Sequence, residues 1–174
     1  MGKRRNQKAY NLVCRGNRRA LRHLLRKHSD LRTSNDANLV FAAIWHNRGM
    51  LRWLLEHGVS PDCRLGELGN TPLMQAAADG DLWAMKMLLK YGADANAINS
   101  YSENPLGFAV TWEQAEAVRL LLAAGADVNN TEDSGPGRTQ LDCAELSQWS
   151  EGIEALRNAG GKGFVELPSD APTA

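Results

Sequence analysis

The chain has 174 residues, of which 43% are hydrophobic, and its 20 basic and 20 acidic side chains give a formal net charge of zero. No apolar run reaches the length of about 18 residues that a membrane-spanning helix requires, and the start MGKRRNQKAY lacks the apolar segment of a secretory signal. Three cysteines, an odd number, cannot form a closed disulfide framework. The composition therefore excludes a disulfide-rich secreted domain and predicts a cytoplasmic chain with reduced cysteines.

The N-terminal 32 residues are strongly basic although the whole chain is neutral. They hold eleven Lys or Arg side chains against one acid, and the remaining residues hold 9 basic and 19 acidic side chains. Two interpretations stay open. The long side chains can cover the solvated face of a terminal structural unit, or they can bind an acidic protein segment, nucleic acid or a membrane surface in a salt-sensitive way. The predicted basic patch consists of Arg15, Arg18, Arg19 and Arg22.

The first predicted two-helix repeat, about residues 7–33, is a weak copy of a pattern that becomes clearer further along the chain. Leu24-Leu25 and Gly16 match Leu88-Leu89 and Gly80 at an offset of 64 residues. A second repeat is predicted at about residues 34–66, and Gly58 closes it as a helix stop.

The third repeat, about residues 67–99, has the most complete signals for two short helices. Thr71 suits a helix N-cap and Pro72 suits the first helical position. Gly80 offers a tight turn, and a second helix with an apolar stripe is expected to end at Gly92. Helices shorter than about 12 residues are marginal in isolation, so this pair must pack against neighbouring pairs.

The same order of residues recurs at an offset of 33, which predicts a fourth repeat at about residues 100–133 and a fifth at 134–161. Glu113 stands where the turn glycine is expected. In four repeats one leucine precedes a second by 15 positions: Leu39 and Leu54, Leu73 and Leu88, Leu106 and Leu121, Leu141 and Leu156. Residues 162–174 lack periodicity and are expected to be a flexible extension.

These residues resemble the ankyrin-repeat family. The resemblance rests on Gly69-Asn70-Thr71-Pro72-Leu73, on Gly92-Ala93-Asp94-Ala95-Asn96 and on Gly125-Ala126-Asp127-Val128-Asn129. It implies an all-α ankyrin-repeat solenoid of about five stacked helix-turn-helix units with hairpin-like loops, forming a single array over residues 1–161 in which the first and last repeats act as caps. The family's histidine after Thr-Pro-Leu is replaced by Val40, Met74, Gly107 and Asp142, so its hydrogen bonds to the turn are expected to be absent.

The resemblance also implies a concave partner-binding face, formed by the ends of the first helices and the hairpin tips. Trp45 and Trp112 align with Asp79 of the best repeat, so stacking does not require an apolar residue there. We predict that both tryptophans are exposed anchors, with packing in the core as the alternative; Trp53 is expected to be core, and Trp149 a cap residue. The predicted partner-binding residues are Ile44, Trp45, Arg64, Leu65, Glu67, Asp79, Tyr101, Glu103, Thr111 and Trp112.

No catalytic, metal-binding or cofactor-binding residues are predicted. The four histidines form no HExxH pair, and no Cys-x-x-Cys spacing accompanies them. Asn129 matches the family's acceptor for asparagine hydroxylation, although a structural role in its turn is favoured. The sequence thus predicts a monomeric, non-catalytic module that binds another protein, with no cofactor and no membrane partner. The alternative is a binder of an acidic ligand or, less favoured, of nucleic acid, through the basic N-terminal repeat.

Overall fold

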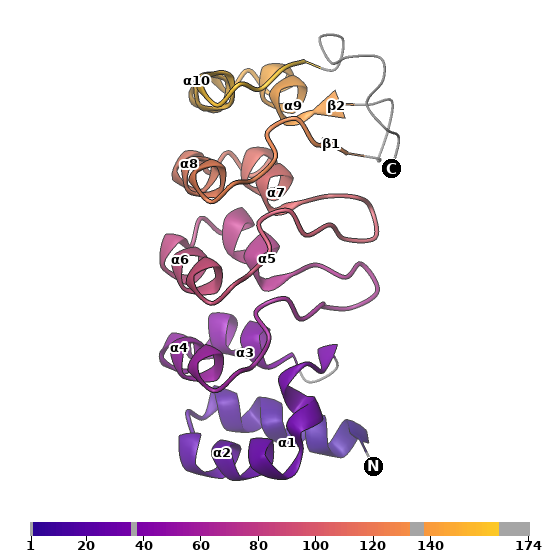
Figure 1. Cartoon of the computed structure of the whole chain (residues 1–174), viewed down its shortest axis with the longest axis vertical. Coiled ribbons are helices and arrows are strands. Elements are labelled where there is room, and N and C mark those ends of the chain that lie inside the picture. The colour runs from indigo at the N-terminus through magenta and orange to yellow at the C-terminus, as the bar shows by residue number, and fades with distance from the viewer. Residues whose placement is uncertain (1, 36–37, 133–137, 164–174) are drawn as a thin grey trace. The chain divides into compact units, whose positions relative to one another are not determined.

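The structure is a computed structural model that describes residues 2–35, 38–132 and 138–163. Its helices follow one another in pairs joined by short turns, which confirms the predicted all-α fold of helix-turn-helix repeats (Figure 1). The α-helices of the described residues are α1 (Gly2–Cys14), α2 (Arg18–Lys27), α3 (Leu39–His46), α4 (Arg48–Glu56), α5 (Pro72–Ala78), α6 (Leu82–Lys90), α7 (Pro105–Thr111), α8 (Ala115–Ala123), α9 (Gln140–Leu146) and α10 (Ser150–Asn158).

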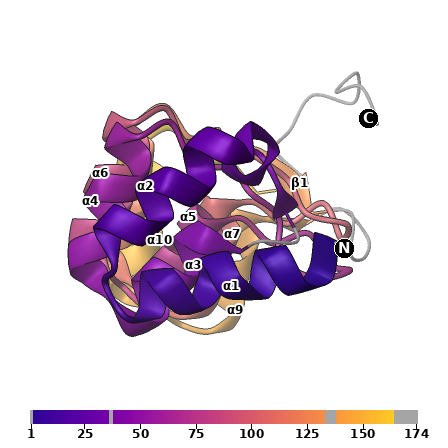
Figure 2. The same cartoon turned by 90° about the horizontal axis from the view of Figure 1, so that it is seen from below.

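The chain divides into two compact units. The N-terminal unit comprises Met1–Ala76 with Trp83–Asp94, and the C-terminal unit comprises Ala77–Leu82 with Ala95–Ala174. In the N-terminal unit, α1 packs against both α2 and α3, and α3 packs against α4; Figure 2 looks onto the pair α1 and α2. In the C-terminal unit, α7 packs against α8 and α9, while α10 packs against α8 and α9. Within each unit, helix pairs therefore stack on neighbouring pairs.

The second leucine of each predicted pair lies in the core. Leu54, Leu88, Leu121 and Leu156 are all fully buried. Each lies on the second helix of its repeat, where the apolar stripe faces neighbouring helices. Because these helices have only 9 residues each, most of their stability must come from this packing rather than from helix propensity.

Short polar side chains begin several of the helices, as the sequence predicts. Thr71 Oγ1 accepts a hydrogen bond from the backbone N–H of Met74 at 3.3 Å, so Thr71 acts as the predicted N-cap. The expected absence of hydrogen bonds to the turn is wrong at Asp142, one of the four positions at which the histidine is replaced. Asp142 replaces the family's histidine, yet its carboxylate accepts the backbone N–H of Thr139 at 2.8 Å while Thr139 Oγ1 accepts the N–H of Asp142. This reciprocal capping box supplies the turn with the hydrogen bonds that were expected to be absent.

The turn between α7 and α8 keeps the backbone conformation of a glycine turn. Glu113 has a positive φ of 52°, close to the 62° of Gly80 at the equivalent position. A residue with a Cβ is strained there by roughly 1–2 kcal/mol. The stacking of the repeat therefore holds a conformation that the side chain of Glu113 does not favour.

Asparagine side chains tie successive repeats of the C-terminal unit together. Asn96 Oδ1 accepts the backbone N–H of Asp127 at 2.8 Å, and its amide donates to the carbonyl of Gly125 at 3.1 Å. Asn129 repeats this arrangement by accepting the backbone N–H of Lys162 at 2.9 Å. The amide of Asn129 thus has the structural role that the sequence favours.

A small hairpin precedes α9. Its strands β1 (Thr131–Glu132) and β2 (Arg138–Thr139) pair antiparallel, with Thr131 opposite Thr139. Residues 133–137, which follow β1 in the sequence, and nearly all of the predicted flexible extension at 162–174 lie outside the described residues. In the part of the chain that the structure describes, none of the helices is both long and apolar enough to cross a bilayer.

Candidate functional site

The most exposed tryptophan of the described residues lies directly after α7 in the C-terminal unit. The side chain of Trp112 is 61% exposed, although its backbone is well held. Its N–H donates to the carbonyl of Phe108 at 3.2 Å, and its own carbonyl accepts the side-chain amide of Gln114 at 2.8 Å. A large aromatic surface is therefore presented to solvent from an ordered backbone.

A small hollow lies beside this tryptophan. It has a volume of about 90 Å³ and is lined by Glu103, Gly107, Phe108, Thr111 and Trp112. Three of the predicted site residues, Glu103, Thr111 and Trp112, thus meet at one place. Phe108 is not among the predicted residues, although it precedes Trp112 by one helical turn and such residues share a helix face.

The loop before α7 is organised by a buried asparagine. Asn99 is 5% exposed, and its Oδ1 accepts the backbone N–H groups of Tyr101 at 2.9 Å and Glu103 at 3.0 Å. Its amide donates to Glu103 Oε2 at 2.7 Å. These bonds fix the tip, where Tyr101 is 56% exposed.

Asp79, another predicted partner-binding residue of the C-terminal unit, is exposed as well. The aromatic site of the C-terminal unit comprises Tyr101, Glu103, Phe108, Thr111 and Trp112.

The N-terminal unit carries a second exposed tryptophan at the end of α3. Trp45 is 45% exposed, and its ring lies 5.4 Å from that of Phe41. Its neighbour Ile44, a predicted partner-binding residue, is buried with only 9% exposed. Residues 39–44 are apolar throughout and all buried, so this stretch of α3 leaves Ile44 little surface for a partner.

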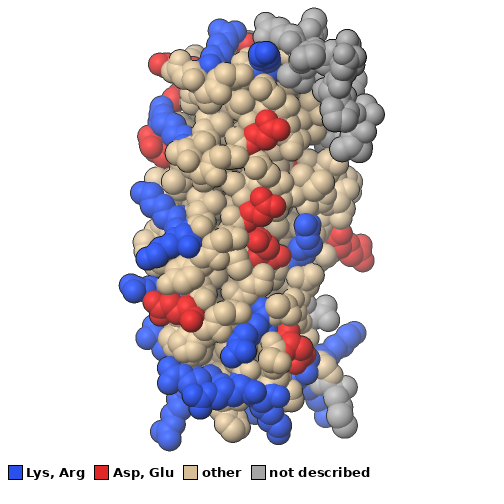
Figure 3. All heavy atoms as spheres, in the orientation of Figure 1, with Lys and Arg blue, Asp and Glu red and all other residues tan. Residues whose placement is uncertain are grey.

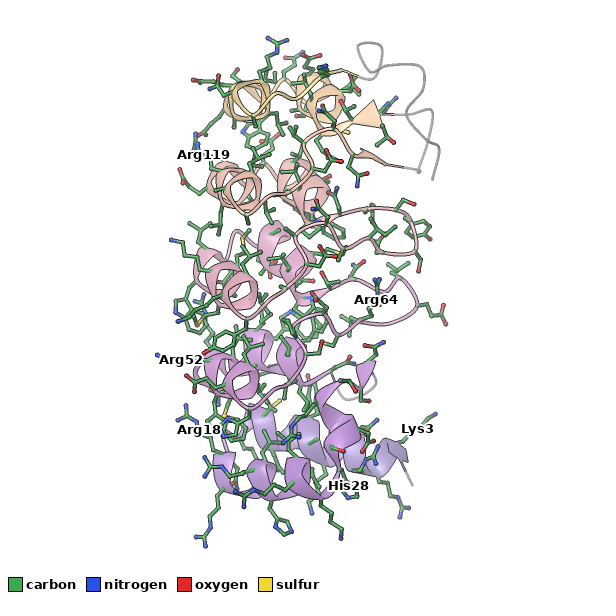
Figure 4. All side chains as sticks on the ribbon, in the orientation of Figure 1. Lys3, Arg18, His28, Arg52, Arg64 and Arg119 are labelled. Atoms are coloured by element: carbon green, nitrogen blue, oxygen red, sulfur yellow. The ribbon has the colours of Figure 1, made fainter. Side chains whose placement is uncertain are left out.

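Three predicted residues of the N-terminal unit lie on the loop between α4 and α5. Arg64 is exposed, and its guanidinium donates to the carbonyl of Gly69 at 3.2 Å (Figure 4). Leu65 is half-buried and pairs with Asn70 in an isolated antiparallel bridge. Glu67 is exposed. Arg64 and Glu67 could therefore reach a partner, whereas Leu65 also closes its own loop.

The other tryptophans differ from Trp45 and Trp112. Trp53 is 6% exposed and its ring stacks on His57 at 3.9 Å, which confirms it as a core residue. Trp83, on α6, is 44% exposed, and the guanidinium of Arg48 lies 5.3 Å from its ring centre. Trp149 is half-buried and precedes α10 as its N-cap residue.

The four predicted basic residues all lie exposed on or next to α1 and α2 in the N-terminal unit. Figure 3 shows Lys and Arg side chains gathered over these two helices. Arg18 donates to the carbonyl of Gly49 at 2.8 Å, and Arg22 lies 5.9 Å from the ring centre of Trp53. These contacts hold Arg18 and Arg22 against α4.

The cysteines form no disulfide, and the described residues contain no group of three metal-ligating side chains. Cys63 is buried, and its burial raises the pKa of its thiol to about 12. Since the thiolate is the reactive form of cysteine, this side chain is chemically inert in the folded protein.

We expect Cys63 to react with iodoacetamide at least about 100-fold more slowly in the folded chain than in the urea-unfolded chain at about pH 8. The pKa of about 12 keeps the thiol protonated at this pH, and burial blocks access to it. Peptide mapping by mass spectrometry separates its rate from those of Cys14 and Cys143. Equal rates for Cys63 in the two states would contradict the burial.

The comparisons with known proteins agree with this architecture. The family described as ankyrin repeats (3 copies) matches residues 60–132. The chain is 35% identical over 115 residues to the transient receptor potential cation channel subfamily A member 1 homolog of Caenorhabditis elegans, covering 64% of the chain and 10% of that protein. It is 32% identical over 98 residues to human ankyrin repeat and SOCS box protein 16, covering 56% of the chain and 21% of that protein.

A relative of more similar length is cyclin-dependent kinase 4 inhibitor B of Bos taurus. It is 32% identical over 94 residues, which are 54% of the chain and 70% of that protein. By contrast, the chain spans only a small part of the channel homolog and of the SOCS box protein. The repeated residue pattern, the stacked helix pairs and these likenesses lead to one conclusion: the chain belongs to the ankyrin-repeat family.

Proposed function

We propose that this ankyrin-repeat protein is a non-catalytic module that binds another protein through exposed aromatic side chains. The observation that carries the proposal is Trp112, which is 61% exposed on an ordered backbone beside a hollow. Trp45 supplies a similar aromatic surface in the N-terminal unit. Ankyrin repeats are in general protein-interaction modules. The bovine relative is named as an inhibitor of a kinase, which is consistent with action through binding.

The aromatic site of the C-terminal unit suits a protein partner in its chemistry. Trp and Tyr are enriched among the residues that dominate binding energy at interfaces. The hollow of about 90 Å³ exceeds the space that one water molecule needs, so it can receive a small aliphatic side chain against the rings of Phe108 and Trp112. The carboxylate of Glu103 at its edge favours a donor or a cation beside that side chain.

A prearranged surface also lowers the cost of binding. Hydrogen bonds from Asn99 already order the loop that carries Tyr101 and Glu103. Association then loses less conformational entropy than it would if the loop had to fold onto the partner. We propose that the chain acts as a monomer in the cytoplasm, where its three thiols would stay reduced.

We expect Trp112→Ala to weaken partner binding by about 2 kcal/mol, and Trp45→Ala to do so by a similar amount. Each change removes an exposed ring that would be desolvated in the complex. Proteins retained from cell lysate by the immobilised wild-type chain can be identified by mass spectrometry. The Kd of a purified retained protein is then measured by calorimetry for each variant.

Trp83→Ala is the matched control, because Trp83 is similarly exposed but lies on a second helix beside Arg48. Its affinity should equal that of the wild type, and all three variants should keep the wild-type melting temperature. A loss of affinity with Trp83→Ala equal to that with Trp112→Ala would indicate unspecific aromatic adhesion. A drop in melting temperature for Trp112→Ala would mark that ring as part of the core. Either result overturns the proposal for this site.

A further inference from the structure

Two adjoining hollows lie on the surface of α1 and α2, away from the aromatic residues of the proposed function. One, of about 470 Å³, is lined by Lys8, Arg19 and Leu24 among others. The second, of about 390 Å³, is lined by residues that include Arg4, Lys8, Leu12 and Arg15. Lys8 borders both hollows. Together they form a surface, which we call the basic groove, in which the half-buried Leu12 and Ala20 lie among exposed cations.

The cations of the basic groove have few acidic neighbours within their own segment. Neither α1 nor α2 contains an Asp or Glu residue. The one acid among residues 1–32 is Asp30, which pairs with Arg5 at 2.6 Å. Like charges spaced by one helical turn, such as Arg4 and Lys8, destabilise a helix. Helix stability therefore does not account for this concentration of positive charge.

A solvated terminal face does not require a single sign of charge either. The last helix pair of the described residues, α9 and α10, carries both signs, and Arg157 pairs with Glu145 at 2.7 Å across the two helices. Arg119 of α8 likewise pairs with Glu151 of α10 at 2.8 Å. Exposed side chains of both charges are thus compatible with the fold of α9 and α10. The charged residues of α1 and α2 are all basic, and a solvated terminal face does not explain this.

We infer that the basic groove binds an acidic, amphipathic helical segment of another protein. The apolar side of such a segment would lie on the half-buried Leu12 and Ala20, and its carboxylates would pair with Lys8, Arg15 and Arg19 along the rim. Single-stranded nucleic acid fits less well, because binding it usually depends on aromatic side chains that stack with bases. The only Phe, Tyr or Trp residue of α1 and α2, Tyr10, is half-buried and holds His46 through a 2.9 Å hydrogen bond.

The first test uses a fluorescent helical peptide of about 18 residues, five turns long, with Leu on one face and Glu along both edges of that face. The reference peptide has the same composition in scrambled order. Fluorescence anisotropy with the full chain should show the amphipathic peptide binding about tenfold more tightly than the scrambled one. Raising the salt from about 0.05 M to about 0.3 M should weaken its binding by about tenfold, since exposed charges are then screened.

The variant Lys8→Gln/Arg19→Gln tests the rim, and both residues are exposed, so the fold should be kept. We expect its affinity for the amphipathic peptide to fall by about tenfold. The matched control, Lys86→Gln/Lys90→Gln on α6, removes the same charge from exposed positions and should change affinity by less than about twofold. Circular dichroism melting checks that both variants stay folded.

Three results would overturn the inference. The scrambled peptide could bind as tightly as the amphipathic one, which would show that only charge is recognised. The two double variants could lose affinity equally, which would place the effect in the net charge of the chain. Single-stranded DNA or phosphatidylserine vesicles could bind more tightly than the peptide at the same salt, which would assign the groove to another class of partner. None of these results bears on Trp112, so they are distinguishable from a failure of the proposed function.

Discussion

Replacing Leu121 by alanine is expected to lower the free energy of unfolding by about 3–4 kcal/mol. Leu121 is fully buried on α8, where it shares the buried stripe with Ala117 and Val118. Because α8 packs against both α7 and α10, a cavity at this position removes contacts with more than one helix. The surrounding short helices can relax only partly, so a cost in the upper part of the usual range is expected.

Leu122→Ala is the matched control within the same helix. Leu122 is half-buried, so its truncation should cost less than about 1.5 kcal/mol. Urea titrations followed by circular dichroism measure both changes, and an unchanged dependence on urea would show that the same surface is exposed on unfolding. Equal losses for the two leucines would contradict the assignment of Leu121 to the core and of Leu122 to its edge.

The sequence predicts those features that depend on repetition. The offset of 33 residues locates the helix pairs, because one repeat with clear caps and turns indicates the limits of its weaker copies. The same alignment makes the exposure of Trp45 and Trp112 predictable, since Asp79 stands at the equivalent position of the best repeat. Both rings are exposed, as the alignment indicates. Their role in binding stays a prediction.

The remaining features depend on contacts that a repeat pattern does not contain. Ile44 aligns with Ala78, so the alignment makes it a candidate for contact with a partner. Residues 39–44 of α3 are all apolar and buried, however, and Ile44 is buried with them. The bonds of Asn99 to its own loop involve a non-repeated tip, so no register predicts them. Likewise, Phe108 lines the hollow beside Trp112, and the orientation of its side chain depends on how α7 packs. Site geometry therefore comes from tertiary packing, whereas the fold comes from local periodicity.

A second large effect is expected at the start of α10, where Gly152→Ala should destabilise the chain by about 2–3 kcal/mol. Gly152 is buried, and a Cβ atom there would run into the indole ring of Trp149. In most exposed helix positions this substitution would instead be stabilising, because alanine has the higher helix propensity. The sign of the effect therefore reports whether the indole lies over Gly152.

The control is the same substitution in a Trp149→Ala background. Without the indole, Gly152→Ala should be neutral or should stabilise the chain by up to about 1 kcal/mol, and urea titrations of the four proteins in this cycle give the coupling energy. A destabilisation of the same size in both backgrounds would mean that another contact limits the space at Gly152. If the sign changes as expected, the lack of a side chain at Gly152 is what allows the indole of Trp149 to pack over α10.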